Sequence, residues 1–247
     1  MSDPQSTRVR GTLSVVIPAY AQERWIGNDL ERIQSRLEEI SADHEIVVVV
    51  DGVVDRTEEL ARAVAGPSTR VEVLEENRGK GFAVRHGILG TRGQIVGFID
   101  AGGDIDPTAI ATAARTVDRG LADIAVGSKR HPLSSGSYPF IRRVYSWGYQ
   151  LLIAVLFSLK VRDTQVGIKF MTRDVVDKIF PDLCTDGFSF DVELLALARR
   201  RGFVRVEECP VTIVAGFPST INTRTAWEML IDTLRTFVRM RIKKSYD

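Results

Sequence analysis

The chain has 247 residues, of which 44% are hydrophobic and 26% are charged, and its net charge is +1 at pH 7. These proportions are those of a globular protein, and they exclude a disordered, collagenous or coiled-coil chain. The near-zero net charge argues against a protein that binds polyanions over its whole surface. Two cysteines, Cys184 and Cys209, are too few for a disulfide framework or a four-cysteine zinc site, and the three histidines lack metal-ligand spacing. Both observations favour a reducing, cytosolic compartment.

Membrane-spanning segments are not expected. The longest apolar stretch, residues 151–159, is half as long as the ~20 residues that a spanning helix needs. The first apolar run, residues 13–19, is too short for a secretory signal. We therefore expect a cytoplasmic protein that is either soluble or peripheral on the cytoplasmic face of a membrane.

Short apolar runs alternate along the chain with helical patterns. Strands are expected at 13–17, 45–50, 71–74, 95–99 and 124–127, and again near 203–206 and 211–214. Helices are expected at 26–40, 57–65, 80–89, 107–119, 190–201 and 224–243. Near-continuous apolar strands that alternate with helices indicate an α/β fold with a mostly parallel sheet and helices on both faces, a three-layer arrangement. The chain divides into a flexible N-terminus (1–10), one main domain (11–222) and a C-terminal amphipathic basic helix (223–247).

Two carboxylates follow buried strands directly. Asp51 comes at the end of the second strand and Asp100 at the end of the fourth, so both are expected at one edge of the sheet, where such folds bind ligands. One of them suits a hydrogen bond from a base or ribose, and the other suits a divalent metal on a diphosphate. The alternative is that each aspartate only caps the helix that follows it.

The segment Asn77-Arg78-Gly79-Lys80-Gly81 precedes a predicted helix. Backbone N–H groups and the helix dipole favour an anion at such a helix start, and Lys80 adds a positive charge. The segment matches neither a P-loop nor a dinucleotide fingerprint. A simple turn is an equal alternative.

Between residues 124 and 162 every charged side chain is basic, and six aromatic residues lie among them. A buried helix explains the apolar part of this stretch but not its lack of acidic residues, so we expect an anionic partner there, such as a phosphate. Nucleic acid is not expected, because the cations are sparse and the whole chain is nearly neutral. The helix at 224–243 is amphipathic with a basic end, which suits either a membrane surface or docking on the domain.

Taken in order, the motifs resemble those of the inverting family 2 glycosyltransferases, which have the GT-A fold. The matching segments are VVIPAYAQE (15–23), VVVDGVVDRT (48–57), NRGKGFAVRHGI (77–88), VGFIDAGGDID (96–106), VGSKR (126–130), DTQVGIKFMTR (163–173) and FDVELLALARRRG (190–202). The last three are most similar to the branch of dolichyl-phosphate glucosyltransferases and polyprenyl-phosphate sugar transferases. The resemblance covers residues 12–215.

This resemblance implies a role for each matching position. The nucleotide sugar would contact Pro18, Ala19, Tyr20, Glu23, Asp51, Gly79, Lys80, Gly81, Asp100 and Ala101, with Asp51 accepting from the base. Mg²⁺ or Mn²⁺ would be held by Asp100 and Asp104. The catalytic residues would be Asp191, which resembles the base of many relatives, and Asp163. The acceptor phosphate would be held by Ser128, Lys129, Arg130, Arg142, Arg143 and Lys169.

The chain also departs from the family pattern. Val50 and Val53 replace an Asp and a Ser, and Gly102 stands where the metal motif has its second carboxylate. Asp104, two residues later, replaces that carboxylate if the two preceding glycines let the loop turn back. Relatives of this branch often carry transmembrane segments, and none is recognisable here.

Three functions follow as hypotheses. The first is an enzyme that moves a hexose, with glucose from UDP-glucose favoured over mannose from GDP-mannose, to a polyprenyl phosphate in the cell envelope. The second is a glycosyltransferase for a soluble acceptor. The third is a nucleotide-sugar-binding protein with weakened catalysis, which the substitutions at Val50 and Gly102 suggest.

Overall fold

The computed structural model of the chain describes residues 8–135, 140–214, 223–241 and 246, and the side chains of 140–147, 223, 224 and 226 lie outside that description. Seven strands are formed by β1 (Leu13–Ala19), β2 (His44–Asp51), β3 (Thr69–Leu74), β4 (Ile95–Ile99), β5 (Ile124–Ser128), β6 (Ile168–Thr172) and β7 (Val206–Pro210). The helices are α1 (Ile26–Ile40), α2 (Thr57–Val64), α3 (Lys80–Leu89), α4 (Thr108–Asp118), α5 (Phe140–Phe157), α6 (Arg173–Ile179), α7 (Phe190–Arg200) and α8 (Thr223–Arg241), with a short 3₁₀ turn at Phe180–Asp182.

All seven strands belong to one sheet in the order β3-β2-β1-β4-β6-β5-β7. Strands β1 to β4 are parallel, whereas β6 is antiparallel to both of its neighbours, β4 and β5. Because β6 reverses the direction twice, β5 again runs parallel to β4. The carboxyl ends of β1, β2, β4 and β5 therefore lie at one edge of the sheet, as expected for an α/β ligand site.

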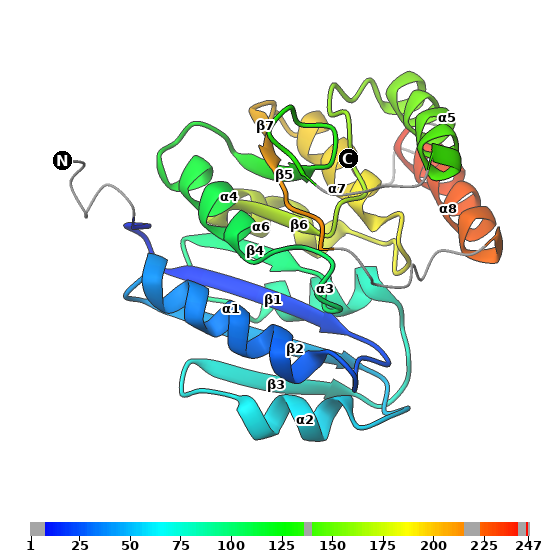
Figure 1. Cartoon of the computed structure of the whole chain (residues 1–247). Coiled ribbons are helices and arrows are strands. Elements are labelled where there is room, and N and C mark those ends of the chain that lie inside the picture. The colour runs from blue at the N-terminus through cyan, green and yellow to red at the C-terminus, as the bar shows by residue number, and fades with distance from the viewer. Residues whose placement is uncertain (1–7, 136–139, 215–222, 242–245, 247) are drawn as a thin grey trace.

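Helices cover both faces of the sheet and make three layers (Figure 1). On one face α1, α2 and α4 pack against the sheet, with Leu30, Ala61 and Ile110 buried there. On the other face lie α3, α6 and α7, with Val84 and Leu194 among the buried residues. The α/β fold with helices on both faces is confirmed.

Two parts of the sequence analysis are wrong. A single strand, β7, replaces the two predicted at 203–206 and 211–214; Thr212 and Ile213 form only isolated bridges. Two glutamates interrupt the apolar run of β7, which pairs only with β5 at the edge of the sheet. Strand β6 and helix α6 were not predicted, because Lys169 interrupts the apolar pattern of β6.

The two ends of the described chain adjoin the main domain. At the N-terminal end Val9 is buried, and its N–H donates to the carbonyl of Ile40 at 2.8 Å. Near the C-terminal end, Arg239 of α8 pairs with Glu193 of α7 at 3.1 Å. None of the described helices has the length and apolar character needed to cross a bilayer.

The carboxylate of Glu45 ties the start of β2 to neighbouring segments. It accepts hydrogen bonds from Ser14 Oγ and the N–H of Arg92, each at 2.6 Å, and from Arg70 Nη1 at 3.0 Å. Burial opposes ionisation of this group, but the three donors outweigh burial and lower the pKa of Glu45.

We expect Glu45→Gln to reduce the free energy of unfolding by about 1–2 kcal/mol near neutral pH, because a charged acceptor is lost. Since the pKa is lower in the folded chain than in the unfolded chain, the stabilisation is complete above the unfolded pKa and is lost as the pH falls through the folded one. Urea unfolding at a series of pH values should show the difference from wild type shrinking in acid. A difference independent of pH would contradict the assignment.

Candidate active site

Asp51, at the end of β2, organises the start of α3. The side chain is buried, and its two oxygens accept hydrogen bonds from the N–H groups of Arg78 at 2.7 Å and Gly79 at 2.9 Å. The carboxylate thus fixes the loop that leads into Lys80. Its expected contact with a base stays a prediction, and in the structure its partners are backbone groups of the protein itself.

The two glycines around Lys80 allow α3 to approach the loop 185–187. Gly79 has a φ of 99°, and a Cβ there would lie 2.5 Å from the carbonyl oxygen of Asp186. A Cβ on Gly81 would collide with the carbonyl of Thr185. The amides of Gly81 and Phe82 donate to the Asp186 carbonyl at 2.7 and 3.2 Å.

These contacts correct the idea that the amides at the start of α3 cradle an anion. Four successive or near-successive N–H groups, those of Arg78, Gly79, Gly81 and Phe82, already donate to Asp51 or Asp186. The glycines are explained by close packing of backbone on backbone. In this segment, the side chain of Lys80 is the group that faces the rim, by which we mean the edge of the sheet formed by the carboxyl ends of β1, β2, β4 and β5.

Lys80 lies between two carboxylates. Its Nζ donates to Asp100 Oδ2 at 2.7 Å and lies 3.9 Å from Asp191 Oδ2, and only 10% of the side chain is exposed. Burial alone disfavours the charged lysine, but the attraction of Asp100 and Asp191 outweighs it and raises the pKa of Lys80. Lys80 therefore stays positively charged at neutral pH.

A second lysine completes this group of charges. Lys169 extends from β6 with no exposed surface, and its Nζ lies 2.6 Å from Asp191 Oδ1 and donates to the Val166 carbonyl at 3.0 Å. Asp191 is 1% exposed, and its contact with Lys169 is a short buried ion pair. We call Lys80, Asp100, Asp191 and Lys169 the charge chain.

The position of Lys169 corrects its assignment to the acceptor phosphate. A side chain without exposed surface cannot contact an acceptor from outside, and this one already neutralises Asp191. Asp191 is equally enclosed, and burial raises its pKa more than Lys169 and Lys80 lower it. As it lies in the structure, Asp191 faces two lysines and has no open approach for an acceptor hydroxyl.

The loop after β4 brings Asp104 back toward Asp100. Gly102 and Gly103 have φ values of 115° and 70°, which residues with side chains rarely adopt. Burial raises the pKa of Asp104, and repulsion from Asp100 raises it further, which places the two carboxylates within electrostatic reach. The oxygen Oδ1 of Asp100 is buried and has no hydrogen-bond partner.

These features fit a divalent metal. Mg²⁺ and Mn²⁺ commonly use one or two carboxylates together with phosphate oxygens, and an unpartnered carboxylate oxygen beside a second carboxylate is a suitable donor set. Over the described part of the chain, no three or more His, Cys, Asp or Glu side chains are grouped so as to hold a metal ion by themselves. Asp100 and Asp104 would therefore need a phosphate to complete the coordination.

Two further residues support this loop, and the sequence analysis gave them no role. Asp29 of α1 is buried and accepts from the N–H of Gly102 at 2.8 Å, and burial raises its pKa. The carbonyl of Gly167 accepts a hydrogen bond from the N–H of Asp100 at 2.7 Å, and a Cβ at Gly167 would collide with the Asp100 carboxylate. The sequence contained a sign of this role, because Asp29 is an acidic residue at the border of the apolar stripe of its helix.

The structure describes contacts for only some of the residues predicted to bind the acceptor phosphate. Asp163 accepts from the N–H of Lys129 at 3.1 Å, and burial raises its pKa against the attraction of Lys129 and Lys169. Ser128 is buried at the end of β5, with Oγ 3.3 Å from the N–H of Arg130. The side chains of Arg142 and Arg143, in α5, lie outside the described part of the chain.

The loop after β1 and Ala101, in the loop after β4, carry the remaining predicted contacts to the nucleotide. Pro18 and Ala19 end the strand, with Ala19 buried in the core and Tyr20 46% exposed beside it. Glu23 lies at the surface, where its carboxylate accepts from the N–H of Arg56 at 3.2 Å and its own N–H donates to Asp55 at 3.1 Å. Ala101 is half-buried and packs on the core.

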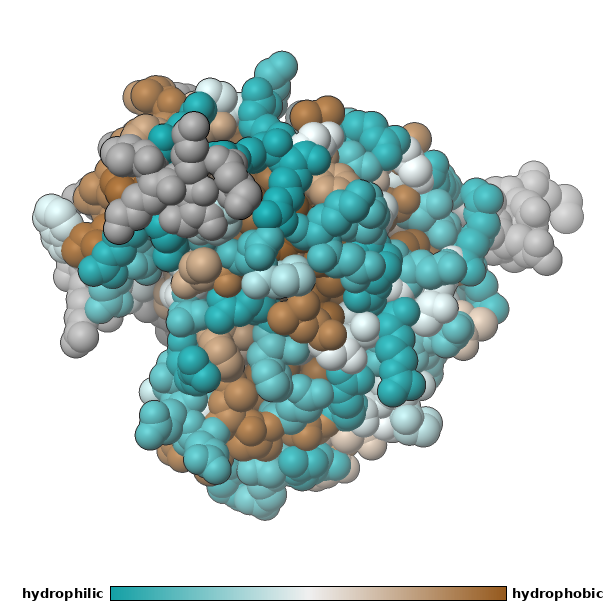
Figure 2. Space-filling model, turned by 180° about the vertical axis from the view of Figure 1, so that it is seen from behind, coloured by the Kyte–Doolittle hydropathy of each residue, from teal (hydrophilic) through white to brown (hydrophobic). Residues whose placement is uncertain are grey.

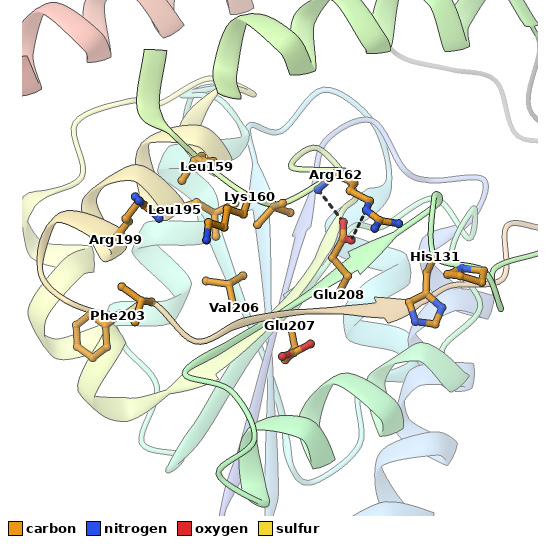
Figure 3. A pocket seen from close by; sticks show the side chains of 13 residues that line it. His131, Leu159, Lys160, Arg162, Leu195, Arg199, Phe203, Val206, Glu207 and Glu208 are labelled. Carbon is orange, nitrogen blue, oxygen red and sulfur yellow. Dashed lines mark hydrogen bonds and ion pairs between the residues drawn. The ribbon is translucent and has the colours of Figure 1, made fainter. Parts of the chain in front are cut away.

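A separate cavity of about 500 Å³ lies along β7, outside this rim (Figure 3). Apolar side chains such as Leu195 and Phe203 form part of its wall, and Lys160 and Arg199 lie near its mouth. Arg162 donates its N–H to Glu208 at 2.9 Å across it. The cavity includes none of the residues predicted for the nucleotide or the metal.

Known proteins share sequence and fold with this chain. Residues 14–180 match the family described as Glycosyl transferase family 2. Dolichyl-phosphate beta-glucosyltransferase of Drosophila melanogaster is 36% identical over 202 residues, which are 75% of this chain and 62% of the fly protein. The same enzyme of Saccharomyces cerevisiae is 32% identical over 221 residues, or 81% of this chain and 66% of the yeast protein. The chain thus spans less than two thirds of the length of these relatives.

Among solved structures, glucosyl-3-phosphoglycerate synthase from Mycobacterium tuberculosis, in complex with Mn²⁺, UDP and phosphoglyceric acid, has a TM-score of 0.74. It is 19% identical, and the superposition covers 95% of this chain and 80% of that one. This likeness supports the fold alone. The match over two thirds of the sequence and the identity to named relatives, together with the GT-A-like sheet, show that the chain belongs to glycosyltransferase family 2.

Proposed function

We propose that this chain transfers glucose from UDP-glucose to the phosphate of a polyprenyl lipid, with inversion at the sugar carbon. The similarity to enzymes named dolichyl-phosphate beta-glucosyltransferase, over about three quarters of the chain, supports glucose as the sugar and a polyprenyl phosphate as the acceptor class. The observation that carries the proposal is the contact of Lys80 with Asp100 beside Asp104, at the edge where the sheet would receive a diphosphate.

The proposed reaction needs little proton transfer. An oxygen of the acceptor phosphate attacks C1 of the glucose, the bond from C1 to the diphosphate breaks, and UDP leaves with the bonding electrons. A lipid phosphate is already ionised at neutral pH, so its oxygen is a ready nucleophile. The protein must instead stabilise the charge that develops on the leaving diphosphate.

Lys80 is the residue best placed for that task. It is charged, nearly enclosed and held by two carboxylates, so it needs little reorganisation when negative charge develops nearby. Asp100 and Asp104 would hold Mg²⁺ or Mn²⁺ on the diphosphate. A divalent ion there, when bound, supplies Lewis-acid stabilisation of the leaving group.

Asp191 fits a positioning role in this scheme better than that of a base. It is enclosed beside Lys169 and Lys80, and an ionised phosphate acceptor has no proton to give up. We infer that Asp191 and Lys169 hold Lys80 in place. Lys129 and Arg130, with Arg142 and Arg143, remain our candidates for the acceptor phosphate, and Asp163 orders the loop of Lys129.

The proposed activity is tested by mixing the purified protein with labelled UDP-glucose, undecaprenyl phosphate and Mn²⁺. We expect a lipid-linked glucose that is cleaved by mild acid, and its formation should cease when EDTA removes the metal. GDP-mannose in place of UDP-glucose is the donor control. Transfer only to a soluble phosphorylated acceptor would replace this proposal with that of a soluble-acceptor enzyme, and UDP binding without any transfer would indicate weakened catalysis.

Asp104→Asn tests the replacement of the missing carboxylate. We expect the Mn²⁺ concentration for half-maximal activity to rise at least about tenfold, which is the loss seen when even a supporting residue of a metal site is removed. Asp106→Asn is the matched control, because Asp106 instead binds Arg32 at 3.2 Å and caps the N–H of Thr108 at 2.8 Å. Equal metal dependence in the two variants would exclude Asp104 as a ligand.

The pair Lys169 and Asp191 is tested by a double-mutant cycle. Lys169→Met leaves a buried carboxylate without its nearest counter-charge, so we expect a loss of about 3–5 kcal/mol in the free energy of unfolding. The double variant Lys169→Met/Asp191→Asn removes both charges and should recover much of that stability and part of the transfer rate. If Asp191 were the catalytic base, the double variant would fold well and remain as inactive as Asp191→Asn alone.

A further inference from the structure

Helix α8 is turned with its apolar side outward. Four large apolar side chains on one stripe are exposed: Trp227 (67%), Ile231 (44%), Leu234 (44%) and Val238 (36%). They recur at intervals of four, three and four residues, so they share one face of the helix. A helix on the surface of a globular protein normally buries such a stripe against the core.

The inner side of α8 carries polar side chains between apolar ones. Thr233 and Thr236 are fully buried there, between Met229 and Met240. Thr233 Oγ1 lies 2.7 Å from the hydroxyl of Tyr149, and Thr236 Oγ1 lies 3.3 Å from that of Thr185. Since these polar partners fix which side of α8 faces the protein, the apolar stripe has no place in the core.

Arg239 strengthens the same attachment. It donates to Thr185 Oγ1 at 2.7 Å and to Glu193 Oε1 at 3.1 Å, and Glu193 also accepts from the hydroxyl of Tyr246. Glu193 is fully buried, so α8 is held by an ion pair to an enclosed carboxylate. The outward direction of the stripe is therefore a property of the fold.

Helix α5 adds to the exposed apolar surface. Leu151 and Val155 are 67% and 71% exposed, whereas Ile153 and Phe157 of the same helix are buried. The two helices contact each other where the ring of Phe157 meets that of Phe237, at 6.0 Å between centroids. Figure 2 views the molecule from behind and shows brown surface at its upper left, which corresponds to the upper right of Figure 1, where α5 and α8 lie.

The two segments that carry these helices are rich in basic residues. Residues 140–162 and 223–247 together contain ten Lys and Arg side chains against three Asp and Glu. On α8 itself, Arg235 is 71% exposed beside the apolar stripe, and Arg241 is exposed at the helix end. Apolar side chains with an aromatic residue and flanking basic groups are the composition of a helix that lies in the interface of an anionic bilayer.

We propose that the outward faces of α5 and α8, defined by Leu151, Val155, Trp227, Ile231, Leu234 and Val238, form a docking surface for an anionic lipid bilayer. The positive charge of the two segments favours a lipid surface over a second copy of this chain, whose equally basic segments would repel it. The inference rests on the proposed function, in which the acceptor is itself a lipid.

The docking surface lies close to the charge chain. Thr185, which contacts Arg239 and Thr236 of α8, belongs to the loop whose Asp186 carbonyl binds the start of α3. Lys80 is the first residue of α3. Docking through α8 would therefore hold the bilayer on a helix that packs directly against the loop beside Lys80.

The test is flotation of the full chain with vesicles of phosphatidylcholine and phosphatidylglycerol. Ile231→Gln/Leu234→Gln should reduce binding at least about tenfold, because two apolar side chains no longer enter the lipid. Glutamine preserves helix propensity, and both positions are exposed, so circular dichroism should show an unchanged fold. Leu89→Gln/Leu121→Gln is the matched control, since these leucines are 49% and 62% exposed on other elements, and it should float like wild type.

Transfer assays separate this inference from the proposed function. With a short, water-soluble prenyl phosphate the α8 variant should transfer glucose like wild type, whereas with undecaprenyl phosphate in vesicles its rate should fall as its binding does. Normal flotation of the α8 variant would overturn the docking surface even if transfer were demonstrated. Loss of self-association in place of vesicle binding, measured by ultracentrifugation, would assign the face to a second copy instead. If the α8 variant lost flotation and neither the variant nor the wild-type chain transferred glucose, the docking surface would be retained and the proposed reaction rejected.

Discussion

Lys80 pairs with Asp100 at 2.7 Å, and the arrangement of the site depends on that contact. Burying a lysine is costly unless carboxylates lie close by, and Asp191 supplies the second one from α7. Asp191 would in turn be a buried anion without Lys169 from β6. Four elements distant in sequence must therefore meet before any one of these charges can be buried, which couples the position of Lys80 to the complete fold.

The antiparallel strand β6 explains how this meeting is possible. It is inserted between β4 and β5, and it brings Gly167 against Asp100 and Lys169 against Asp191. The lack of a side chain at Gly167 gives the Asp100 carboxylate its space. The insertion of β6 thus provides both the space for the side chain of Asp100, the predicted metal ligand, and the positive charge of Lys169 that the charge chain needs.

The sequence allowed the strand-end positions of Asp51 and Asp100 to be predicted, because buried parallel strands have clear apolar runs and end at a common edge. It did not reveal the burial of Lys169, since a charged residue in a strand looks like a break in the pattern. The amphipathic stripe of α8 was also visible, but periodicity records where apolar residues lie and does not say whether protein or lipid covers them. The inner polar contacts of Thr233 and Arg239, which fix the side of α8 that packs on the protein, come from distant segments.

We propose that Lys80, Asp100 and Asp104 together receive a diphosphate with a divalent cation. The most direct test of this proposal is titration calorimetry of UDP, with and without Mn²⁺, on the wild-type chain and on Asp100→Asn. We expect Mn²⁺ to tighten the binding of UDP to the wild-type protein, and we expect the tightening to vanish in the variant. Equal UDP affinity with and without Mn²⁺ in the wild-type chain would contradict the account.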